Sequence, residues 1–252
     1  DLVGRDQELA RLSDPQNRLI AIGGIGGQVK SSLAAFYALT CRRKPEYEFV
    51  EWRDCREQND TFHTVLIKTV QSLIGNTTSL DTLKELSIDK LAQELASYFS
   101  QRQGILVFDN VDHYVDLHTG SPLGPLKALL DSIQPQQLKT QLVFTARPLL
   151  KFESANADSI MLRGLADHDA RALFEQKSSS EISDSDFAVL RDVTEGHPLW
   201  ILLIAARCRH QKVTAKFVLD EIASGKGELP ERTILSIWNT LNDKQKTVLR
   251  TL

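Results

Sequence analysis

The sequence predicts an α/β fold, in which helices cover both faces of a parallel sheet and a helical subdomain follows. Two features of its pattern indicate this fold. Short apolar segments alternate with helical patterns over about the first 160 residues, and only helical patterns follow from about residue 165. With 252 residues, of which 42% are hydrophobic, the chain can also fill a sizeable core.

Each predicted strand is a compact apolar run bounded by polar or turn residues. The strands are Leu19–Gly23, Tyr47–Trp52, Gly104–Phe108, Gln141–Thr145 and Ser159–Leu162. Between them, apolar residues recur every three or four positions, which predicts amphipathic helices. These helices include Ser32–Leu39, Thr64–Leu73, Ile88–Phe99 and Leu123–Ile133. Strands that alternate with helices are typical of a parallel sheet, because each crossover returns the chain to the same end of the sheet.

The second part of the chain is predicted to be helical throughout. Its helices are Asp167–Phe174, Phe187–Val193, Pro198–Cys208 and Ala215–Ala223. The polar run Lys177–Asp186 is expected to form a solvated loop between the first two of them. Two further helices, Thr233–Leu241 and Asp243–Leu252, complete the chain. We therefore expect three domains, at residues 1–163, 164–226 and 227–252, the last of them truncated.

Composition excludes several classes of protein. A net charge of −3, from 30 basic and 33 acidic residues, provides no global attraction for nucleic acid or for anionic lipid. The longest apolar run, Leu199–Ala206, is far shorter than the ~20 residues of a membrane helix, so no span is expected. The chain has an odd number of cysteines, Cys41, Cys55 and Cys208, and they are widely spaced, which indicates reduced thiols in a cytoplasmic protein. Because the sequence begins with Asp1, we expect it to be part of a longer chain.

The stretch IGGIGGQVKSSL, residues 22–33, nearly matches the phosphate-binding spacing G-x-x-x-x-G-K-[ST] when counted from Gly24. A predicted strand precedes it and a predicted helix follows, which is the context this motif requires. Backbone N–H groups of such a turn bind phosphates, and the helix dipole favours their negative charge. The predicted nucleotide-binding residues are Gly24, Gly26, Gly27, Gln28, Val29, Lys30, Ser31 and Ser32. The alternative is a glycine-rich turn with a chance Lys-Ser pair.

Within this loop, Lys30 is predicted to contact the β- and γ-phosphates of ATP or ADP, and Ser31 to bind Mg²⁺. Val29 departs from the motif, which has glycine at that position. Valine is β-branched and places methyl groups where phosphate oxygens would approach the backbone. We therefore expect nucleotide binding to be weakened.

Two further motifs follow predicted strands. Asp109 follows the apolar run Ile105–Phe108, so we expect it to bind Mg²⁺ and to face the loop from the neighbouring strand; the alternative is a cap on the next turn. Asn110 cannot accept a proton as a carboxylate would, so slow ATP turnover is expected, with Asp112 as a possible substitute base. Arg147 is a candidate sensor of the γ-phosphate or, alternatively, a surface arginine. Lys30, Asp109 and Arg147 are thus the candidate catalytic residues.

Three more segments complete a resemblance to the STAND-class P-loop ATPases, in particular the NB-ARC type. Residues 2–9, LVGRDQEL, resemble the family's VGR-x-x-E-L segment, and residues 162–174, LRGLADHDARALF, resemble the start of its helical subdomain. Residues 195–199, EGHPL, resemble its G-x-P-L motif. The resemblance covers essentially the whole chain and implies a nucleotide-binding α/β domain, a helical lid and the start of a winged helix. It also implies that Val3 and Arg5 lie near the base and ribose, and that Pro198 packs against the adenine.

The resemblance implies a signalling switch: ADP would hold a closed monomer, and ATP would release it for self-association. Sensor and effector domains would flank this core in the full-length protein. A second hypothesis is a scaffold that binds no nucleotide, for which Val29 and Asn110 are the evidence. A third is a DNA-binding transcription regulator, which the acidic net charge disfavours.

Overall fold

The computed structural model describes residues 2–56, 61–75 and 80–224. The predicted helices Thr233–Leu241 and Asp243–Leu252, and with them the expected third domain at 227–252, lie outside these ranges. The described residues form two compact units. Residues 5–25 and 30–162 form one, called the sheet unit below, and residues 2–4, 26–29 and 163–224 form the other, called the helical unit.

The sheet unit contains a parallel sheet, as the alternating pattern predicts. Its strands are β1 (Leu19–Gly23), β2 (Phe49–Asp54), β3 (Gly104–Asp109), β4 (Gln141–Ala146) and β5 (Ala157–Met161). Every pair of neighbouring strands is parallel, and their order across the sheet is β2-β3-β4-β1-β5. All residues of β1, β3 and β4 are buried, because these central strands are covered on both faces.

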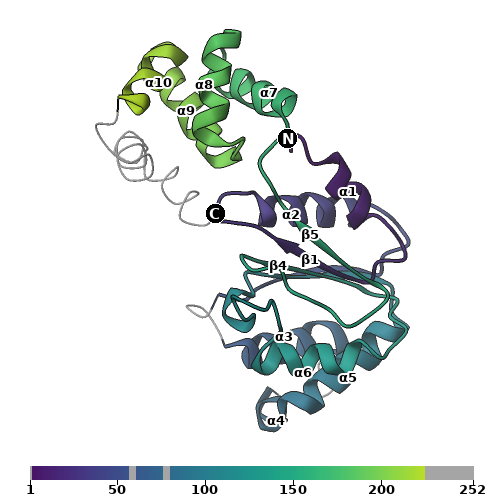
Figure 1. Ribbon diagram of the computed structural model, residues 1–252. Helices are drawn as coiled ribbons and strands as arrows, with labels where there is room; N and C mark the ends of the chain where they lie inside the picture. Colours follow the sequence, from purple (N-terminus) through teal and green to yellow (C-terminus); the bar gives the residue numbers. More distant parts are fainter. Residues whose placement is uncertain (1, 57–60, 76–79, 225–252) are drawn as a thin grey trace. The chain divides into compact units, whose positions relative to one another are not determined.

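Helices cover both faces of this sheet, which confirms the predicted fold class (Figure 1). On one face lie α1 (Asp6–Leu12) and α2 (Lys30–Cys41), and on the other lie α3 (Phe62–Ile74), α5 (Ile88–Gln101) and α6 (Gly124–Ile133). The short α4 (Leu80–Glu85) and a 3-10 turn, η1 (Asp112–Tyr114), complete the unit. Side-chain hydroxyls cap two of these helices: Thr61 accepts from the Thr64 N–H, and Ser87 from the Lys90 N–H.

A core of stacked aromatic rings joins the sheet to the α3 side. The rings of Phe108 on β3 and Phe144 on β4 are stacked with centroids 5.3 Å apart, and Phe62 of α3 lies 5.7 Å from Phe108. All three rings are fully buried, as are Leu66, Leu95 and Leu129 from the helices around them. β3 ends one residue after Phe108 and β4 ends two residues after Phe144, so the aromatic core lies next to the polar residues at the carboxyl ends of these strands.

The strand order corrects one expectation from the sequence. We expected the strand that ends at Asp109 to neighbour the strand that precedes the phosphate-binding loop. Instead β4 lies between β3 and β1. Apolar patterns predict that a strand is buried but not which strands lie beside it, because several buried strands share the same pattern.

Several boundaries also differ from the prediction, among them those of β2 and of the loop between the first two helices of the second part. β2 spans Phe49–Asp54 rather than Tyr47–Trp52, because backbone pairing with β3 extends through polar residues that the pattern excluded. The predicted loop Lys177–Asp186 is shorter than expected, since the flanking helices end at residue 178 and begin at residue 184. Ile182 lies within this short connection and is buried, so the connection is not fully solvated.

The helical unit contains α7 (Asp167–Ser178), α8 (Asp184–Thr194), α9 (Pro198–Gln211) and α10 (Ala215–Ala223). These helices enclose a core of their own that includes Phe174, Leu190, Ile204 and Leu219. Val3, from the start of the chain, packs against this core.

Two observations bear on the class of protein that the composition indicates. Across the described ranges, none of the helices combines the length and apolar composition that crossing a membrane requires. Cys41, Cys55 and Cys208 are buried free thiols.

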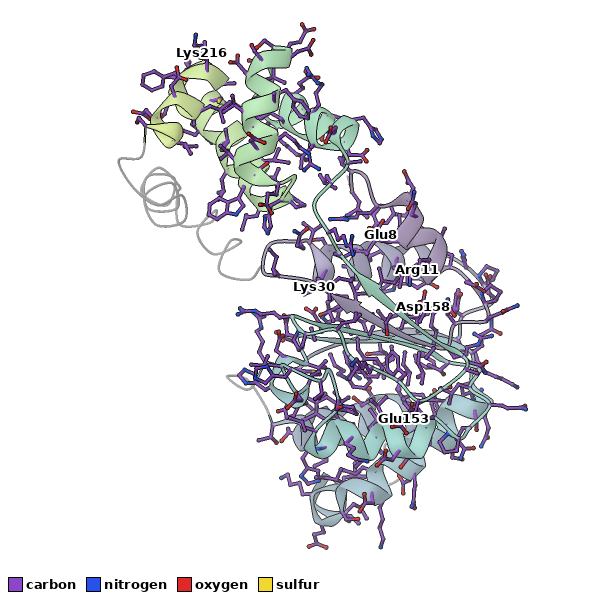
Figure 2. The ribbon with its side chains drawn as sticks, in the orientation of Figure 1. Glu8, Arg11, Lys30, Glu153, Asp158 and Lys216 are labelled. Carbon is purple, nitrogen blue, oxygen red and sulfur yellow. The ribbon has the colours of Figure 1, made fainter. Side chains whose placement is uncertain are left out.

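An ion pair joins α1 to the edge strand β5. Arg11 of α1 donates to both carboxylate oxygens of Asp158 on β5, at 2.8 and 2.5 Å (Figure 2). This bidentate pair ties α1 to the edge strand.

A buried glutamine joins three parts of the sheet unit. Gln141, at the start of β4, donates from Nε2 to the carbonyl oxygens of Leu12 and Asn17, at 2.9 and 2.8 Å. Its Oε1 accepts from the Tyr37 hydroxyl at 2.8 Å. The side chain is 4% exposed, so these three partners, rather than water, satisfy its polar atoms.

We expect Gln141→Ala to lower the free energy of unfolding by about 3 kcal/mol, because a buried hydroxyl and two carbonyls lose their partner. Chemical unfolding of the variant against the wild-type chain measures this change. The matched control is Gln136→Ala, whose side chain is exposed in the same unit. A loss no larger than that of the control would mean that the three bonds contribute no net stability.

Candidate phosphate-binding site

The loop after β1 leads directly into α2, which begins at Lys30. The Lys30 ammonium donates to the carbonyl oxygens of Gly24 and Ile25, at 2.7 and 3.2 Å, so it lies within the turn (Figure 2). Burial lowers its pKa; the negative charges of Asp112 and Asp109 oppose this shift, and the positive charge of Arg147 adds to it. The sheet unit thus brings the three predicted catalytic residues into one electrostatic environment.

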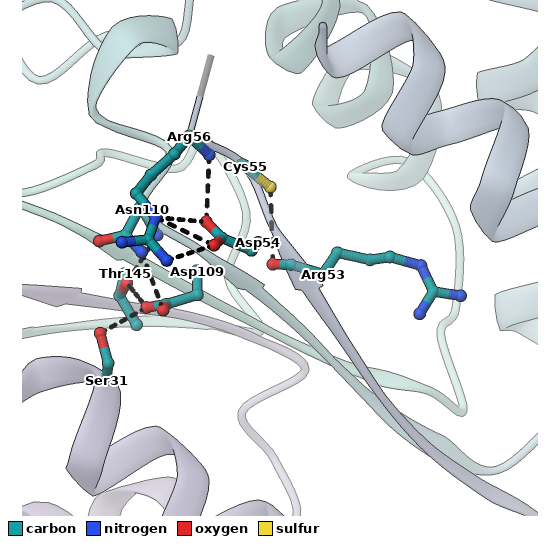
Figure 3. Close-up of polar contacts among 8 residues, drawn as sticks. All are labelled: Ser31, Arg53, Asp54, Cys55, Arg56, Asp109, Asn110 and Thr145. Atoms are coloured by element: carbon teal, nitrogen blue, oxygen red, sulfur yellow. Dashed lines mark hydrogen bonds and ion pairs between the residues drawn. The ribbon is translucent and has the colours of Figure 1, made fainter. Parts of the chain in front are cut away.

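Asp109 ends β3, and three side chains donate to its carboxylate (Figure 3). Oδ1 accepts from the Ser31 hydroxyl at 2.7 Å and from the Thr145 hydroxyl, and Oδ2 accepts from the Asn110 amide at 2.9 Å. Burial raises the pKa of Asp109, while the hydrogen bonds from Thr145 and Ser31 oppose that shift. Although β3 does not neighbour β1, Asp109 therefore contacts the start of α2, and Thr145 on the intervening β4 bonds to the same oxygen.

The two predicted Mg²⁺ ligands, Ser31 and Asp109, are in direct contact. Their oxygens are of the type that Mg²⁺ prefers, and this ion usually completes its shell with water and substrate phosphates. Within the part of the chain that the structure describes, no group of three or more His, Cys, Asp or Glu side chains is placed to hold a metal. The donor set therefore fits an ion that is bound together with a phosphate ligand.

Asn110 and Arg147 are held through their backbones. Asn110 has a left-handed φ of 62°, and its N–H donates to the Thr145 hydroxyl oxygen at 3.0 Å. The Arg147 N–H donates to Oδ1 of Asp112 at 2.7 Å, whereas its Nε is 3.8 Å from the same oxygen. The Arg147 side chain is 76% exposed, so its guanidinium can reorient towards a bound anion.

Sequence reasoning assigned no role to Asp54, which lies beside this site. Asp54 ends β2 and pairs in register with Asp109, and both of its carboxylate oxygens accept from the Arg56 guanidinium (Figure 3). Burial alone would raise the pKa of Asp54, but its hydrogen bonds with Arg56 hold it below its usual value. The prediction ended this strand at Trp52, so the available signal, an acid at the carboxyl end of a strand, was not recognised.

The remaining loop residues, 26–29, belong to the helical unit. Val29 has a φ of 59°, so its backbone adopts the left-handed conformation that glycine favours, and for a β-branched residue this costs about 1–2 kcal/mol. At Gly26, an added Cβ would meet no atom within 4 Å. Packing therefore does not require glycine there, and its absent side chain leaves room for a ligand. Gln28 is buried.

The other predicted binding residues are divided between the two units. Ser32 lies in the first turn of α2 and is half-buried, like Ser31. Arg5 is buried in the sheet unit, where its Nη1 donates to Oε1 of Glu8 at 2.9 Å. In the helical unit, Pro198 is the first residue of α9 and is buried.

Comparison with known proteins identifies the fold. The chain is similar to a Signal Transduction ATPase with Numerous Domains (STAND) protein with a tetratricopeptide repeat sensor from Pyrococcus horikoshii, at 19% identity and a TM-score of 0.53. That match covers 98% of this chain and 33% of the other. A Walker-type ATPase of Pyrococcus abyssi matches at 16% identity and a TM-score of 0.55, covering 89% and 73% of the two chains. Drosophila ORC bound to DNA matches at 16% identity and a TM-score of 0.53, covering 87% and 64%.

These similarities confirm that the chain has the fold of a P-loop NTPase like the STAND ATPases. The chain spans about a third of the length of the STAND protein it matches. No protein-family model and no curated protein sequence matches it.

Burial of the Asp109 carboxylate predicts how stability depends on pH. Because the pKa of Asp109 is raised in the folded chain, the folded state holds this proton more tightly than the unfolded state does. Its contribution to stability therefore falls as pH rises from the ordinary aspartate pKa, about 3.9, through the folded value. Asp109→Asn carries no such charge, so we expect the variant to gain stability over the wild type progressively across this pH range.

Urea unfolding at a series of pH values measures this difference. Asp192→Asn, an exposed change on α8, serves as the control and is expected to follow the wild-type curve. A stability difference between Asp109→Asn and wild type that does not change with pH would contradict the raised pKa.

Proposed function

We propose that this chain is the nucleotide-binding core of an ATP- and ADP-dependent switch. The observation that carries the proposal is the convergence of Lys30, Ser31 and Asp109 where a glycine-rich loop joins a buried strand to a helix. An ammonium within the turn suits a phosphate chain, and a hydroxyl beside a carboxylate suits Mg²⁺. The P-loop NTPase fold of the chain supports the same reading.

In this proposal each residue has a defined role. Lys30 binds the β- and γ-phosphates, Ser31 and Asp109 hold Mg²⁺, and the N–H groups of residues 24–32 bind phosphate oxygens. When bound, Mg²⁺ neutralises charge that develops on the phosphates. Arg147 contacts the γ-phosphate, since its backbone N–H anchors the residue at the carboxyl edge of the sheet and its guanidinium is exposed. By the resemblance to the NB-ARC type, Val3, Arg5 and Pro198 contact the base and ribose.

Turnover of ATP is proposed to be slow. The residue after Asp109 is Asn110, whose amide donates to Asp109 and cannot take a proton from water. Asp112 already accepts a hydrogen bond from the Arg147 N–H. Asp54 is ion-paired with Arg56, which keeps its pKa low and makes it a poor base. Such a site suits a protein that keeps its nucleotide bound and responds to whether that nucleotide is ADP or ATP.

We further propose that residues 1–163 form the nucleotide-binding domain, residues 164–226 a helical lid, and residues 227–252 the start of a winged helix. The P. horikoshii protein has a tetratricopeptide repeat sensor. By analogy, this core would be flanked by a sensor and an effector domain in a longer, cytoplasmic protein that self-associates when active.

Val29 favours a second candidate function, a scaffold that binds no nucleotide. The left-handed conformation of Val29 is strained. We expect its methyl groups to crowd phosphate oxygens that approach the backbone of the loop. The two functions differ in one measurable property, which is the affinity for nucleotide.

We expect Val29→Gly to bind Mg-ADP about tenfold more tightly than the wild-type chain, a gain of about 1.4 kcal/mol that corresponds to relieving the crowding of the bound phosphates. Lys30→Ala is expected to abolish binding in either background. Calorimetric titration with Mg-ADP and Mg-ATP measures both effects. Lys44→Ala, an exposed change just after α2, is the matched control for loss of a lysine charge.

The possible outcomes separate the two functions. Binding by both the wild type and Val29→Gly supports the switch. Binding by Val29→Gly alone makes the wild-type chain a scaffold with a disabled site. If neither chain binds nucleotide, or if Lys30→Ala binds as tightly as Lys44→Ala, the proposed phosphate site is wrong.

A further inference from the structure

One side chain of the helical unit bonds to the backbone of the phosphate-binding loop. Nε2 of His197 lies 2.9 Å from the carbonyl oxygen of Gly26, and both residues belong to this unit. A carbonyl oxygen can only accept a hydrogen bond, so Nε2 of His197 must carry a proton and donate it. The His197 side chain is 94% buried, since its exposed fraction is 6%, so the bond is shielded from competition with water.

The next loop residue is in contact with the same histidine. Gly27 has a φ of +80°, and an added Cβ would lie 2.7 Å from Cε1 of His197 and 2.8 Å from two side-chain atoms of Leu199. These distances leave no room for a side chain at residue 27. The peptide that joins Gly26 to Gly27 is therefore held by a hydrogen bond at its carbonyl and by close packing at the next Cα.

The position of His197 on its helix shows that this contact is not a helix cap. His197 is the N-cap residue of α9, yet its side chain makes no capping hydrogen bond. Serine, threonine, aspartate and asparagine are the usual residues at such a position, because their short side chains bond to the first N–H groups of the helix. The imidazole instead extends to the loop.

Peptide geometry links this contact to phosphate binding. In a planar trans peptide the C=O and the N–H point in opposite directions, and the described residues contain no cis peptide. A hydrogen bond that fixes the Gly26 carbonyl therefore also fixes the direction of the Gly27 N–H. Phosphate-binding loops act through N–H groups whose directions are set before the ligand arrives.

We propose that His197 is a positioning residue for the phosphate-binding loop: it holds the Gly26–Gly27 peptide so that the Gly27 N–H is oriented to donate to the phosphates of a nucleoside diphosphate or triphosphate. This inference rests on the proposed function. It adds a determinant of nucleotide affinity that lies about 170 residues beyond the loop in sequence.

Two substitutions separate the hydrogen bond from simple packing. His197→Leu keeps an apolar side chain of similar size without a donor, whereas His197→Gln keeps an N–H donor at a similar distance from the backbone. His210→Ala is the matched control, since it removes an exposed histidine from the other end of α9. All three are made in the wild-type and the Val29→Gly chains.

The first readout is the affinity for Mg-ADP by calorimetry. His197→Leu is expected to bind about 3- to 10-fold more weakly than its parent, the effect of losing one oriented hydrogen bond. His197→Gln is expected to recover most of this loss, and His210→Ala to leave the affinity unchanged. Equal affinity for His197→Leu and His210→Ala would overturn the inference and leave the proposed function intact.

The second readout needs no nucleotide. NMR spectra of glycine-labelled chain report the Gly26 carbonyl carbon and the Gly27 amide, which respond to a hydrogen bond at the shared peptide. Both resonances are expected to move in His197→Leu and to remain near their wild-type positions in His197→Gln. Unchanged resonances in His197→Leu would show that the peptide is not held by His197. Because this result does not depend on ligand, it tests the inference even if no variant binds nucleotide and the proposed function fails.

Discussion

The buried carboxylate of Asp109 is the constraint on which the polar edge of the sheet depends. A charged group is stable in such a place only when donors surround it, and here Ser31, Thr145 and Asn110 supply them. These donors come from α2, from β4 and from the turn after β3, so a single carboxylate sets the distances between three segments. The Ser31 hydroxyl that satisfies Asp109 is also the group proposed to bind Mg²⁺. In that proposal the Ser31 hydroxyl and the Asp109 carboxylate, which bond to each other here, would both turn to the ion.

Asn110 and Val29 both adopt the left-handed conformation without being glycine, and they differ in what that costs. Asn110 is of a type that tolerates a positive φ, and its N–H bonds to Thr145. Val29 is β-branched and has no such tolerance. Its backbone nevertheless retains the conformation that the motif's glycine would adopt. The departure from the motif therefore carries a local backbone strain at residue 29.

Residues 26–29 of the loop group with the helices, whereas Gly24, Ile25, Lys30 and Ser31 group with the sheet. Loop residues that are adjacent in sequence thus depend on different sets of contacts. The sheet unit holds the Lys30 ammonium and the two predicted metal ligands, and His197 and Leu199 contact the glycine peptide. Contacts made within each unit therefore hold a different part of the loop.

The sequence by itself determined the fold class and the meeting of Ser31 with Asp109 at the end of β3, because burial patterns and short motifs are local. It located the strand before the loop, the helix that begins at Lys30, and the acid at Asp109. Only the tertiary structure decided that β4 lies between β1 and β3, and that Asp54 lies in register beside Asp109. It alone placed His197 on the Gly26 carbonyl. Strand neighbours and contacts between distant residues depend on how the whole chain packs, and no periodicity or motif within a short segment encodes them.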